Sequence, residues 1–363
     1  MNGTWEFGGS GMRVKRMTAS KNQPRRMPES ATSVKRHGDC KAPLGVGAAG
    51  GNQTSHDGNG MPVNELRFDG RVAVVTGAGR GVGRQYVQLL AQRGAAVVVN
   101  DFGVAPDGSG PSAVPAEQLA AEIVGAGGSA VADTHSVADK AGAEAVIRRA
   151  LEEFGHIDVL IHNAGIVDGT FEQLAAVNLG AAFWLTEAAW GHMQAQRYGR
   201  ILLTTSSAGL FGASNGATYG PIQSYGATKM GAFGLGRCLA VRGRSYNIRV
   251  NMVSPHAYTR LAAGLPPTPQ AEFMETYAKP ELVAPGSVFL VHETCPVSGE
   301  AFAVGAGRMA RIFVGETVGY VDSELTVEKV AQNFAQVCDE TGYHVPADMS
   351  AIVDIYRRAV GAD

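Results

Sequence analysis

Short runs of apolar residues recur along the chain and are separated by longer segments of mixed character. Each run is rich in valine, isoleucine or leucine and contains few polar residues, a pattern typical of strands buried on both faces of a parallel sheet. The predicted strands are Val72–Thr76, Ala96–Asn100, Ile157–His162, Ile201–Thr205, Ile248–Val253 and Ala301–Val304.

The segments between these runs have the spacing of helices. Predicted helices cover residues 81–93, 138–154 and 174–196, another includes Leu119–Gly125, and a further one carries Tyr225 and Lys229. Strands that alternate with helices predict an α/β fold, a doubly wound parallel sheet with helices on both faces. Ligands of such folds bind at the carboxyl ends of the strands.

The first 60 residues differ from this central part. They carry nine Lys/Arg and four Asp/Glu and few large apolar side chains, so we expect residues 1–60 to be disordered. A basic targeting peptide is the weaker alternative, because Glu6 and several glycines interrupt any amphipathic helix. Since Met61-Pro62-Val63 looks like a natural beginning shortly before the first strand, we expect that the start of the chain is assigned too early.

The remainder divides into a globular part, residues 61–310, and a C-terminal extension, residues 311–363. The extension is predicted to be helical and to pack against the body or a partner, because four apolar residues have helical spacing. These are Val327, Val330, Phe334 and Val337.

Composition excludes several classes of function. A formal charge of −2 among 363 residues gives no electrostatic basis for binding nucleic acid or an anionic membrane. No apolar run reaches the roughly 18 residues of a membrane span, and no secretory signal is visible. The four cysteines lie far apart, with no spacing typical of zinc or redox sites. We therefore expect a cytoplasmic protein with reduced thiols and no metal site.

Three glycines, Gly77, Gly81 and Gly83, lie where the first predicted strand turns into a helix. Gly77 permits a tight turn, Gly81 lets the backbone approach a pyrophosphate, and Gly83 allows close packing of helix on strand. In a chain with 48 glycines, these residues alone would also suit an ordinary turn. Asp101 favours a dinucleotide, because it lies 18 residues beyond Gly83 at the end of the second strand, where a carboxylate binds ribose hydroxyls.

Asp101 also bears on the choice between NAD and NADP. A carboxylate about 4 Å from a 2′-phosphate costs roughly 1–4 kcal/mol per charge pair, which favours NAD. Arg80 acts in the opposite direction, because a guanidinium in the glycine turn binds phosphate. Asp101 has the fixed position of a strand end, whereas Arg80 can turn into solvent, so the sequence predicts NAD and makes NADP the alternative.

Tyr225 and Lys229 are four residues apart and share one face of a predicted helix. We expect the Lys229 ammonium to lower the pKa of Tyr225, so that Tyr225 exchanges a proton with a substrate hydroxyl. Ser206 follows a strand and can hold the substrate oxygen, although a helix-capping serine has the same pattern. Asn178 can anchor a water that relays the proton, or it can be an amide satisfied inside its helix.

These features resemble the short-chain dehydrogenase/reductase family over about residues 65–310. The resemblance rests on Thr76–Gly83, Asn163-Ala164-Gly165, Asn178, Ser206, Tyr225 with Lys229, and Asn251–Pro255. Within the family, the sequence is most similar to the (3R)-hydroxyacyl-CoA dehydrogenase domains of type 2 peroxisomal multifunctional enzymes. That similarity lies in Val97–Asp101, Tyr198–Ile201, Val283–Pro285 and Phe302–Gly307.

The resemblance implies a Rossmann sheet of about seven strands, an NAD cofactor, a homodimer or homotetramer, and a 3-hydroxyacyl-CoA or steroid-like alcohol as substrate. The alternatives are a steroid or 3-oxoacyl-thioester ketoreductase that uses NAD(P)H, and an inactive nucleotide-binding scaffold. Catalysis is assigned to Asn178, Ser206, Tyr225 and Lys229. Cofactor binding is assigned to Gly77, Arg80, Gly81, Val82, Gly83, Asp101, Ser136, Val137, Asn163, Ala164, Gly165, Tyr225, Lys229, Pro255 and Thr259.

Three departures from the family pattern concern the pocket. The segment between Gly165 and Asn178 is shorter than usual, so one wall must be rebuilt. Ser206 and Tyr225 are 19 residues apart, more than the family favours; Tyr219 has the usual spacing, but Gln223 four residues later cannot lower its pKa. We expect the extra residues, around 213–223, to shape the substrate entrance. His135 stands where the subgroup has an aspartate facing adenine, with Asp133 nearby.

Overall fold

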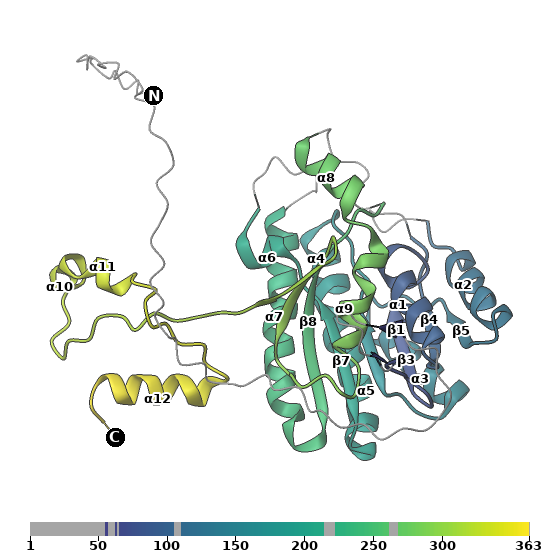
Figure 1. The fold of residues 1–363 in the computed structure, drawn as a ribbon, viewed down its shortest axis with the longest axis horizontal. Coiled ribbons are helices and arrows are strands. Elements are labelled where there is room, and N and C mark those ends of the chain that lie inside the picture. The colour runs from purple at the N-terminus through teal and green to yellow at the C-terminus, as the bar shows by residue number, and fades with distance from the viewer. Residues whose placement is uncertain are drawn as a thin grey trace, which may run out of the picture. The chain divides into compact units, whose positions relative to one another are not determined.

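The computed structural model describes residues 65–104, 110–213, 222–260 and 268–362, and the short strands β1 (Ser55–His56) and β2 (Pro62–Val63), which pair antiparallel (Figure 1). The prediction that residues 1–60 are disordered concerns residues that, apart from β1, lie outside this described part.

An eight-stranded sheet forms the centre of the described chain. Its order is β10-β9-β8-β7-β6-β3-β4-β5, and all neighbours are parallel except β9 and β10. The strands are β3 Val72–Thr76, β4 Ala96–Asn100, β5 Ser129–Asp133, β6 Val159–His162, β7 Gly199–Thr204, β8 Ile248–His256, β9 Ala301–Gly305 and β10 Arg308–Ile312. The predicted doubly wound parallel sheet is confirmed, with one strand more than expected.

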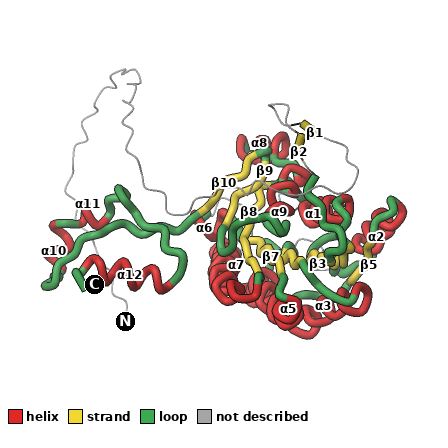
Figure 2. The backbone as a smooth tube through the Cα atoms, turned by 60° about the horizontal axis from the view of Figure 1, so that its bottom comes forward, coloured by secondary structure: helices red, strands yellow, loops and turns green. Residues whose placement is uncertain are grey.

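Helices cover both faces of this sheet (Figure 2). Three of them pack on one face: α1 Gly81–Gln92, α2 Val114–Gly125 and α9 Ala284–Phe289. Three others pack on the opposite face: α3 Lys140–Phe154, α5 Ala181–Gln196 and α7 Ile222–Gly243. The strands between them are buried on both sides, β3 along its whole length, which explains why they appear as continuous apolar runs.

The strand order reverses at β3, which has β4 on one side and β6 on the other. From β3 the chain proceeds outward to β4 and β5, then crosses back to β6 and continues in the other direction. Because the loops on the two sides diverge at such a point, a crevice opens outside the carboxyl ends of the strands. The glycine turn after β3 lies at this position.

Two features of the sheet and helices differ from the prediction. The strands β5 and β10 are not recognised in the sequence. The predicted helix over 174–196 consists of α4 (Phe171–Ala175), a π-helical turn (Ala176–Gly180) and α5. The extra residue of a π-turn shifts the helix face, and Asn178 lies in that turn.

The C-terminal extension contains α10 (Val327–Gln332), α11 (Phe334–Val337) and α12 (Met349–Ala359). It contacts α7 through a hydrogen bond of 2.9 Å from Arg237 Nη2 to Pro346 O, and the 3-10 turn after α7 (Arg244–Tyr246) through an Arg244–Asp348 ion pair of 2.6 Å. Of the four apolar side chains that we expected to pack, Val327 and Phe334 are exposed, by 81% and 58%, whereas Val330 and Val337 are half-buried. Packing of this face against a partner stays a prediction. None of the described helices is long and apolar enough to cross a membrane.

Candidate active site

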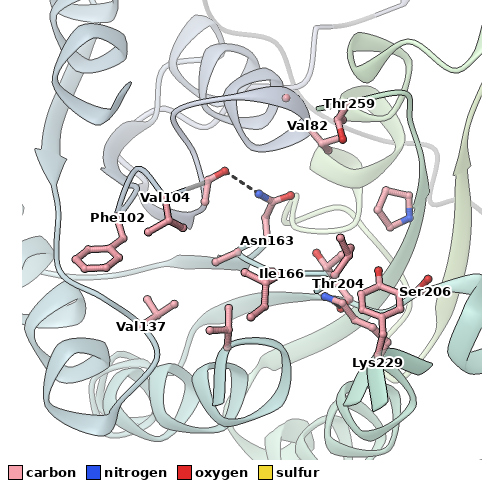
Figure 3. A pocket seen from close by; sticks show the side chains of 18 of the residues that line it. Val82, Phe102, Val104, Val137, Asn163, Ile166, Thr204, Ser206, Lys229 and Thr259 are labelled. Atoms are coloured by element: carbon pink, nitrogen blue, oxygen red, sulfur yellow. Dashed lines mark hydrogen bonds between the residues drawn. The ribbon is translucent and has the colours of Figure 1, made fainter. Parts of the chain in front are cut away.

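A pocket of about 910 Å³ lies at the carboxyl ends of the strands and collects most of the predicted site residues. Figure 3 shows Phe102, Val104 and Val137 towards one end, and Ser206 and Lys229 towards the other. The predicted residues that line it are Gly77, Arg80, Gly81, Val82, Asp101, Ser136, Val137, Asn163, Ala164, Gly165, Ser206, Tyr225, Lys229, Pro255 and Thr259. Gly83 and Asn178 lie behind the wall.

The glycine turn packs against the end of β6. Gly77 has φ +61°, and a Cβ there would lie 2.8 Å from Ala164 Cα, so only glycine fits. The Asn163 side chain donates to the carbonyl oxygens of Thr76 (3.1 Å) and Gly77 (2.9 Å). A Cβ on Gly83 would collide with the Gly77 carbonyl oxygen. The Asn163 amide therefore fixes the turn, and Gly83 lets α1 approach it, as predicted.

Helix α1 begins at this turn without a capping side chain. Its N-cap residue, Arg80, makes no side-chain cap hydrogen bond, and the first turn of α1 contains no acidic residue. The N–H groups of a helix start need acceptors, and the helix dipole favours an anion there. A Cβ on Gly81 would lie 3.3 Å from Thr259 Cγ2, so Thr259 covers the same turn. The residues present fit a pyrophosphate.

Asp101 holds the carboxyl end of β4 against the glycine turn. It is 9% exposed, its Oδ2 accepts from Gly79 N, and its Oδ1 accepts from Gly103 N, both at 2.7 Å. A carboxylate has about four acceptor positions, so both oxygens keep capacity for ribose hydroxyls. Asp101 therefore has a structural role, and its role in binding the ribose stays a prediction.

Ser206 and Tyr225 meet at the other end of the pocket. Ser206 is the N-cap of α6 (Ser207–Phe211), where its Oγ accepts from Ala208 N at 3.2 Å. The Ser206 side chain is also hydrogen-bonded to that of Tyr225. Ser206 therefore caps α6 and also lines the pocket, so its position agrees with both interpretations. The longer spacing between the two residues does not prevent their contact.

Lys229 lies beneath this pair. It is 3% exposed, and its Nζ donates to Thr204 O at 3.2 Å. Burial lowers the pKa of Lys229 to about 8. Burial also raises the pKa of Tyr225, and the hydrogen bond with Ser206 offsets this rise only in part. The predicted lowering of the Tyr225 pKa is therefore wrong, because burial penalises the charged form of both groups.

A comparison with protein families decides which kind of protein this site belongs to. The model of the short chain dehydrogenases matches residues 71–263. This chain belongs to the short chain dehydrogenase family. The match contains the glycine turn, Asp101 and the Ser206–Tyr225–Lys229 group, so the family defines the chemistry as that of oxidoreductases acting on CH–OH donors.

Individual short chain dehydrogenases give the same assignment. Peroxisomal multifunctional enzyme type 2 of Mus musculus is 40% identical over 287 residues, which cover 76% of this chain and 37% of that enzyme. The chain thus spans little more than a third of that relative. The solved structure of the full-length Drosophila melanogaster enzyme is similar with a TM-score of 0.65 and 31% identity, over 82% of this chain and 50% of that one. A 7α-hydroxysteroid dehydrogenase complexed with NADH has a TM-score of 0.57 and 27% identity, over 67% and 95%.

Asn178 is buried in this short chain dehydrogenase and fully hydrogen-bonded. Its Oδ1 accepts from Ile166 N at 3.0 Å, and its Nδ2 donates to Ile166 O (3.0 Å) and Thr228 Oγ1 (3.3 Å). The side chain thus ties the strand-end segment to the π-turn and α7. The interpretation as a satisfied amide is confirmed, and the role in a proton relay stays a prediction.

Several pocket residues of this dehydrogenase are not recognised in the sequence. Phe102 and Val104 follow Asp101 directly, so their position after a ribose-binding carboxylate is a usable signal. The others come from loops whose path the sequence does not reveal. The unpredicted lining residues include Phe102, Val104, Thr204, Thr205, Arg260 and Met274. Tyr219 and most of the extra segment around it lie outside the described residues.

Proposed function

We propose that this chain is an NAD-dependent dehydrogenase that interconverts a secondary alcohol and a ketone, with a 3-hydroxyacyl-CoA as substrate. One observation carries the proposal: the same pocket joins Asp101 and the uncapped start of α1 to the Ser206–Tyr225–Lys229 group. The first part fits the adenosine diphosphate end of a dinucleotide. The second part fits proton transfer beside the nicotinamide end of the same dinucleotide.

The roles of the chain's own groups follow from their positions. A nicotinamide cofactor, when bound, supplies or accepts the hydride. Tyr225, protonated because burial raises its pKa, donates its proton to the substrate oxygen during ketone reduction and recovers it during alcohol oxidation. Ser206 shares its hydroxyl between Tyr225 and that oxygen. Lys229 supplies positive charge near the phenol and is a ligand for the ribose.

Asn178 contributes through position rather than through its side chain. Its amide is occupied by Ile166 and Thr228, so a relay water would rest on the backbone of the π-turn. A Cβ added to Gly165 would lie 3.0 Å from Asn178 Oδ1 and 3.2 Å from Lys229 Nζ. Gly165 thus borders both groups, and a proton that leaves Tyr225 has a route past Lys229 to this turn.

The choice of NAD rests on Asp101, whose carboxylate faces the position of the ribose. Arg80 and Arg260 favour NADP instead. The two guanidiniums lie close enough to interact. Burial and then the positive charge of Arg80 lower the pKa of Arg260, and the Asp101 carboxylate opposes this effect. A fluorescence titration with NADH and NADPH tests the choice: tighter binding of NADH supports the role of Asp101, and tighter binding of NADPH would assign the phosphate to the two arginines.

The substrate proposal draws on the named relatives. Peroxisomal multifunctional enzymes and a peroxisomal hydratase-dehydrogenase-epimerase of Saccharomyces cerevisiae favour an acyl-CoA thioester, whereas the hydroxysteroid dehydrogenase structure supports a steroid alcohol as the alternative. The cytoplasmic location stays a prediction, because these relatives are named peroxisomal. The homo-oligomer and the division at residues 310 and 311 also stay predictions.

Initial rates of NAD reduction with 3-hydroxyacyl-CoA esters and with hydroxysteroids test the proposal. Faster turnover of the thioesters supports it, and faster turnover of the steroids would exchange the two substrate classes. Binding of NADH without turnover of any alcohol or ketone would favour the inactive nucleotide-binding scaffold.

A further inference from the structure

The shortened segment between Gly165 and Asn178 forms a wall of the pocket. It enters α4 soon after β6 and continues into the π-turn. Two residues of α4 and two of the π-turn line the pocket, and their spacing places them on one side of the helix. They are Glu172, Gln173, Ala176 and Val177. The wall that the shorter segment had to rebuild is therefore one side of α4 and the π-turn.

This wall borders the catalytic end of the pocket. Both α4 and the π-turn pack against α7, which carries Tyr225 and Lys229. A Cβ on Gly165 would lie 3.2 Å from Lys229 Nζ, so the segment passes directly beside the lysine before it enters α4. Glu172 lies one helical turn before Ala176 on the same wall. It therefore belongs to the end of the pocket that holds Tyr225.

Glu172 carries a negative charge whose position is fixed. Hydrogen bonds from its own backbone N–H and then from the Thr170 hydroxyl lower the pKa of Glu172. Thr170 is itself fixed as the N-cap of α4, where its Oγ1 accepts from Gln173 N at 3.3 Å. The carboxylate thus occupies the start of α4, where the N–H groups of the helix would otherwise favour an anion. A negative group of a substrate would meet a like charge on this wall.

No positive charge of the described wall offsets Glu172. Burial and then the charge of Arg80 lower the pKa of Arg260, and Asp101 opposes them, so these three groups lie together at the cofactor end. Lys229 is 3% exposed and lies beneath the catalytic pair. Segments 214–221 and 261–267, which lie outside the described residues, contain no Asp, Glu, Lys, Arg or His. The charged residues of the described lining are Arg80, Asp101, Glu172, Lys229 and Arg260.

We propose that Glu172 makes the site selective for substrates that carry no negative charge next to the reacting carbon. A free 3-hydroxy acid has its carboxylate two bonds from the carbinol carbon, whereas the corresponding thioester is neutral at that position. Repulsion between like charges therefore disfavours the acid relative to the thioester. This inference rests on the proposed function and adds a residue that rejects the free acid.

Two substrates that differ in this charge test the inference. The values of kcat/KM are measured at saturating NAD for free 3-hydroxybutyrate and for its neutral N-acetylcysteamine thioester. Glu172→Gln removes the charge and keeps an oxygen that accepts from the N–H and from Thr170. We expect it to raise kcat/KM for the acid roughly three- to tenfold, the effect of one like-charge repulsion at a partly hydrated site. The value for the thioester should stay within about twofold, because the thioester has no charge to repel.

Three controls separate charge from packing. Glu172→Asp keeps the charge and should keep the wild-type preference, and Glu144→Gln, on the exposed surface of α3, should also keep it. Raising the ionic strength from about 0.01 M to about 1 M shortens the Debye length from about 30 Å to about 3 Å. The preference of the wild type for the thioester should then weaken, while that of Glu172→Gln should stay constant.

A binding measurement gives the same comparison without turnover. Acetoacetate and its neutral ethyl ester are titrated into the NADH complex, and the fluorescence of bound NADH reports their dissociation constants. Weaker binding of acetoacetate, relieved in Glu172→Gln, supports the inference even if the thioester is no substrate. A kcat/KM for the acid, or an affinity for acetoacetate, that Glu172→Gln leaves unchanged would overturn the inference while the proposed function stands. Failure of NADH to bind would remove the proposed function and the inference together.

Discussion

The ammonium nitrogen of Lys229 lies 6.0 Å from the centre of the Tyr225 ring, one helical turn along α7. Both groups are enclosed by protein, which raises the pKa of the phenol and lowers that of the ammonium. Burial thus disfavours the charged form of each group, although Lys229, with a pKa of about 8, still carries its charge at neutral pH. Catalysis at this site must work against the desolvation that the fold imposes.

Replacement of Tyr225 by phenylalanine should abolish proton transfer and spare nucleotide binding. The substitution removes the hydroxyl that contacts Ser206 and keeps the ring. We expect turnover to fall roughly 10²–10⁴-fold, with NADH affinity close to that of the wild type, measured by initial rates and by fluorescence titration. Tyr356→Phe, on a side chain 62% exposed in α12, is the matched control. Unchanged turnover in Tyr225→Phe would point to another base, such as Tyr219.

Replacement of Lys229 by methionine should stabilise the protein and inactivate it. The lysine pKa falls from 10.5 to about 8, so the folded state disfavours the ammonium by about 3 kcal/mol near pH 7. Loss of the hydrogen bond to Thr204 offsets about 1 kcal/mol of this. Because the lysine is charged in both states below the folded pKa, the full difference is present below pH 8 and disappears as the pH rises to 10.5.

Urea unfolding of the wild type and of Lys229→Met at pH 7 and at pH 10.5 measures the change in stability, and initial rates measure the loss of activity. We expect a higher free energy of unfolding at pH 7 with no turnover. A variant less stable than the wild type at pH 7 would show that the hydrogen bond to Thr204 O and the packing of Lys229 outweigh its desolvation.

The sheet could be predicted from sequence wherever a strand is buried on both faces. Val72–Thr76 and Ala96–Asn100 have the predicted bounds, because a short, continuous run of valines between turns is typical of a buried parallel strand. The strand Ser129–Asp133 lies at the edge, is partly exposed and consists mainly of small residues, so it lacks that signal. Arg308–Ile312 pairs antiparallel at the opposite edge and is mostly polar or exposed. Edge strands are specified by their neighbour more than by their own composition.

The site could be predicted in its residue types but less well in its electrostatics. Motif spacing placed Asp101, Ser206 and Lys229 in one pocket. Motif spacing did not show that the Asn178 amide is hydrogen-bonded to Ile166 and Thr228, since the π-turn has no sequence signature. It also gave the wrong direction for the pKa of Tyr225. That pKa depends on how completely residues distant in sequence enclose the ring, which spacing along one helix does not contain.

Replacement of Asp101 by alanine should change both cofactor preference and stability. Two buried N–H groups, of Gly79 and Gly103, lose their acceptor, which costs about 1–3 kcal/mol for each group. Relief of the repulsion from a 2′-phosphate should raise the ratio of NADPH to NADH affinity tenfold or more, for a repulsion of about 1–4 kcal/mol. Asp139→Ala removes an exposed cap of α3 and should lower stability without altering the ratio. An unaltered ratio in Asp101→Ala would assign cofactor choice to Arg80 and Arg260.

Acid sensitivity should depend on His162, a fully buried histidine at the end of β6. Its Nε2 lies 3.2 Å from Val177 O, and its Nδ1 has no hydrogen-bond partner in the described chain. Burial, followed by the charge of Lys229, lowers the pKa of His162 from 6.5 to about 3, although the hydrogen bond to Val177 raises it. As the pH falls, the unfolded chain therefore binds a proton near pH 6.5, whereas the folded chain binds it only near pH 3.

This difference makes the contribution of His162 to stability fall as the pH drops below 6.5, by about 1.4 kcal/mol per pH unit. Glutamine places an amide nitrogen near the position of Nε2 and does not titrate. The free energies of unfolding of His162→Gln and of the wild type are measured with urea between pH 7 and 4.5. As the pH falls from 7 to 5, the value for the variant should rise relative to that of the wild type by about 2 kcal/mol. His192→Gln, on the exposed surface of α5, controls for the loss of a histidine. Parallel pH dependences of wild type and His162→Gln would mean that the folded and unfolded chains bind this proton at the same pH, so that burial does not lower the pKa of His162.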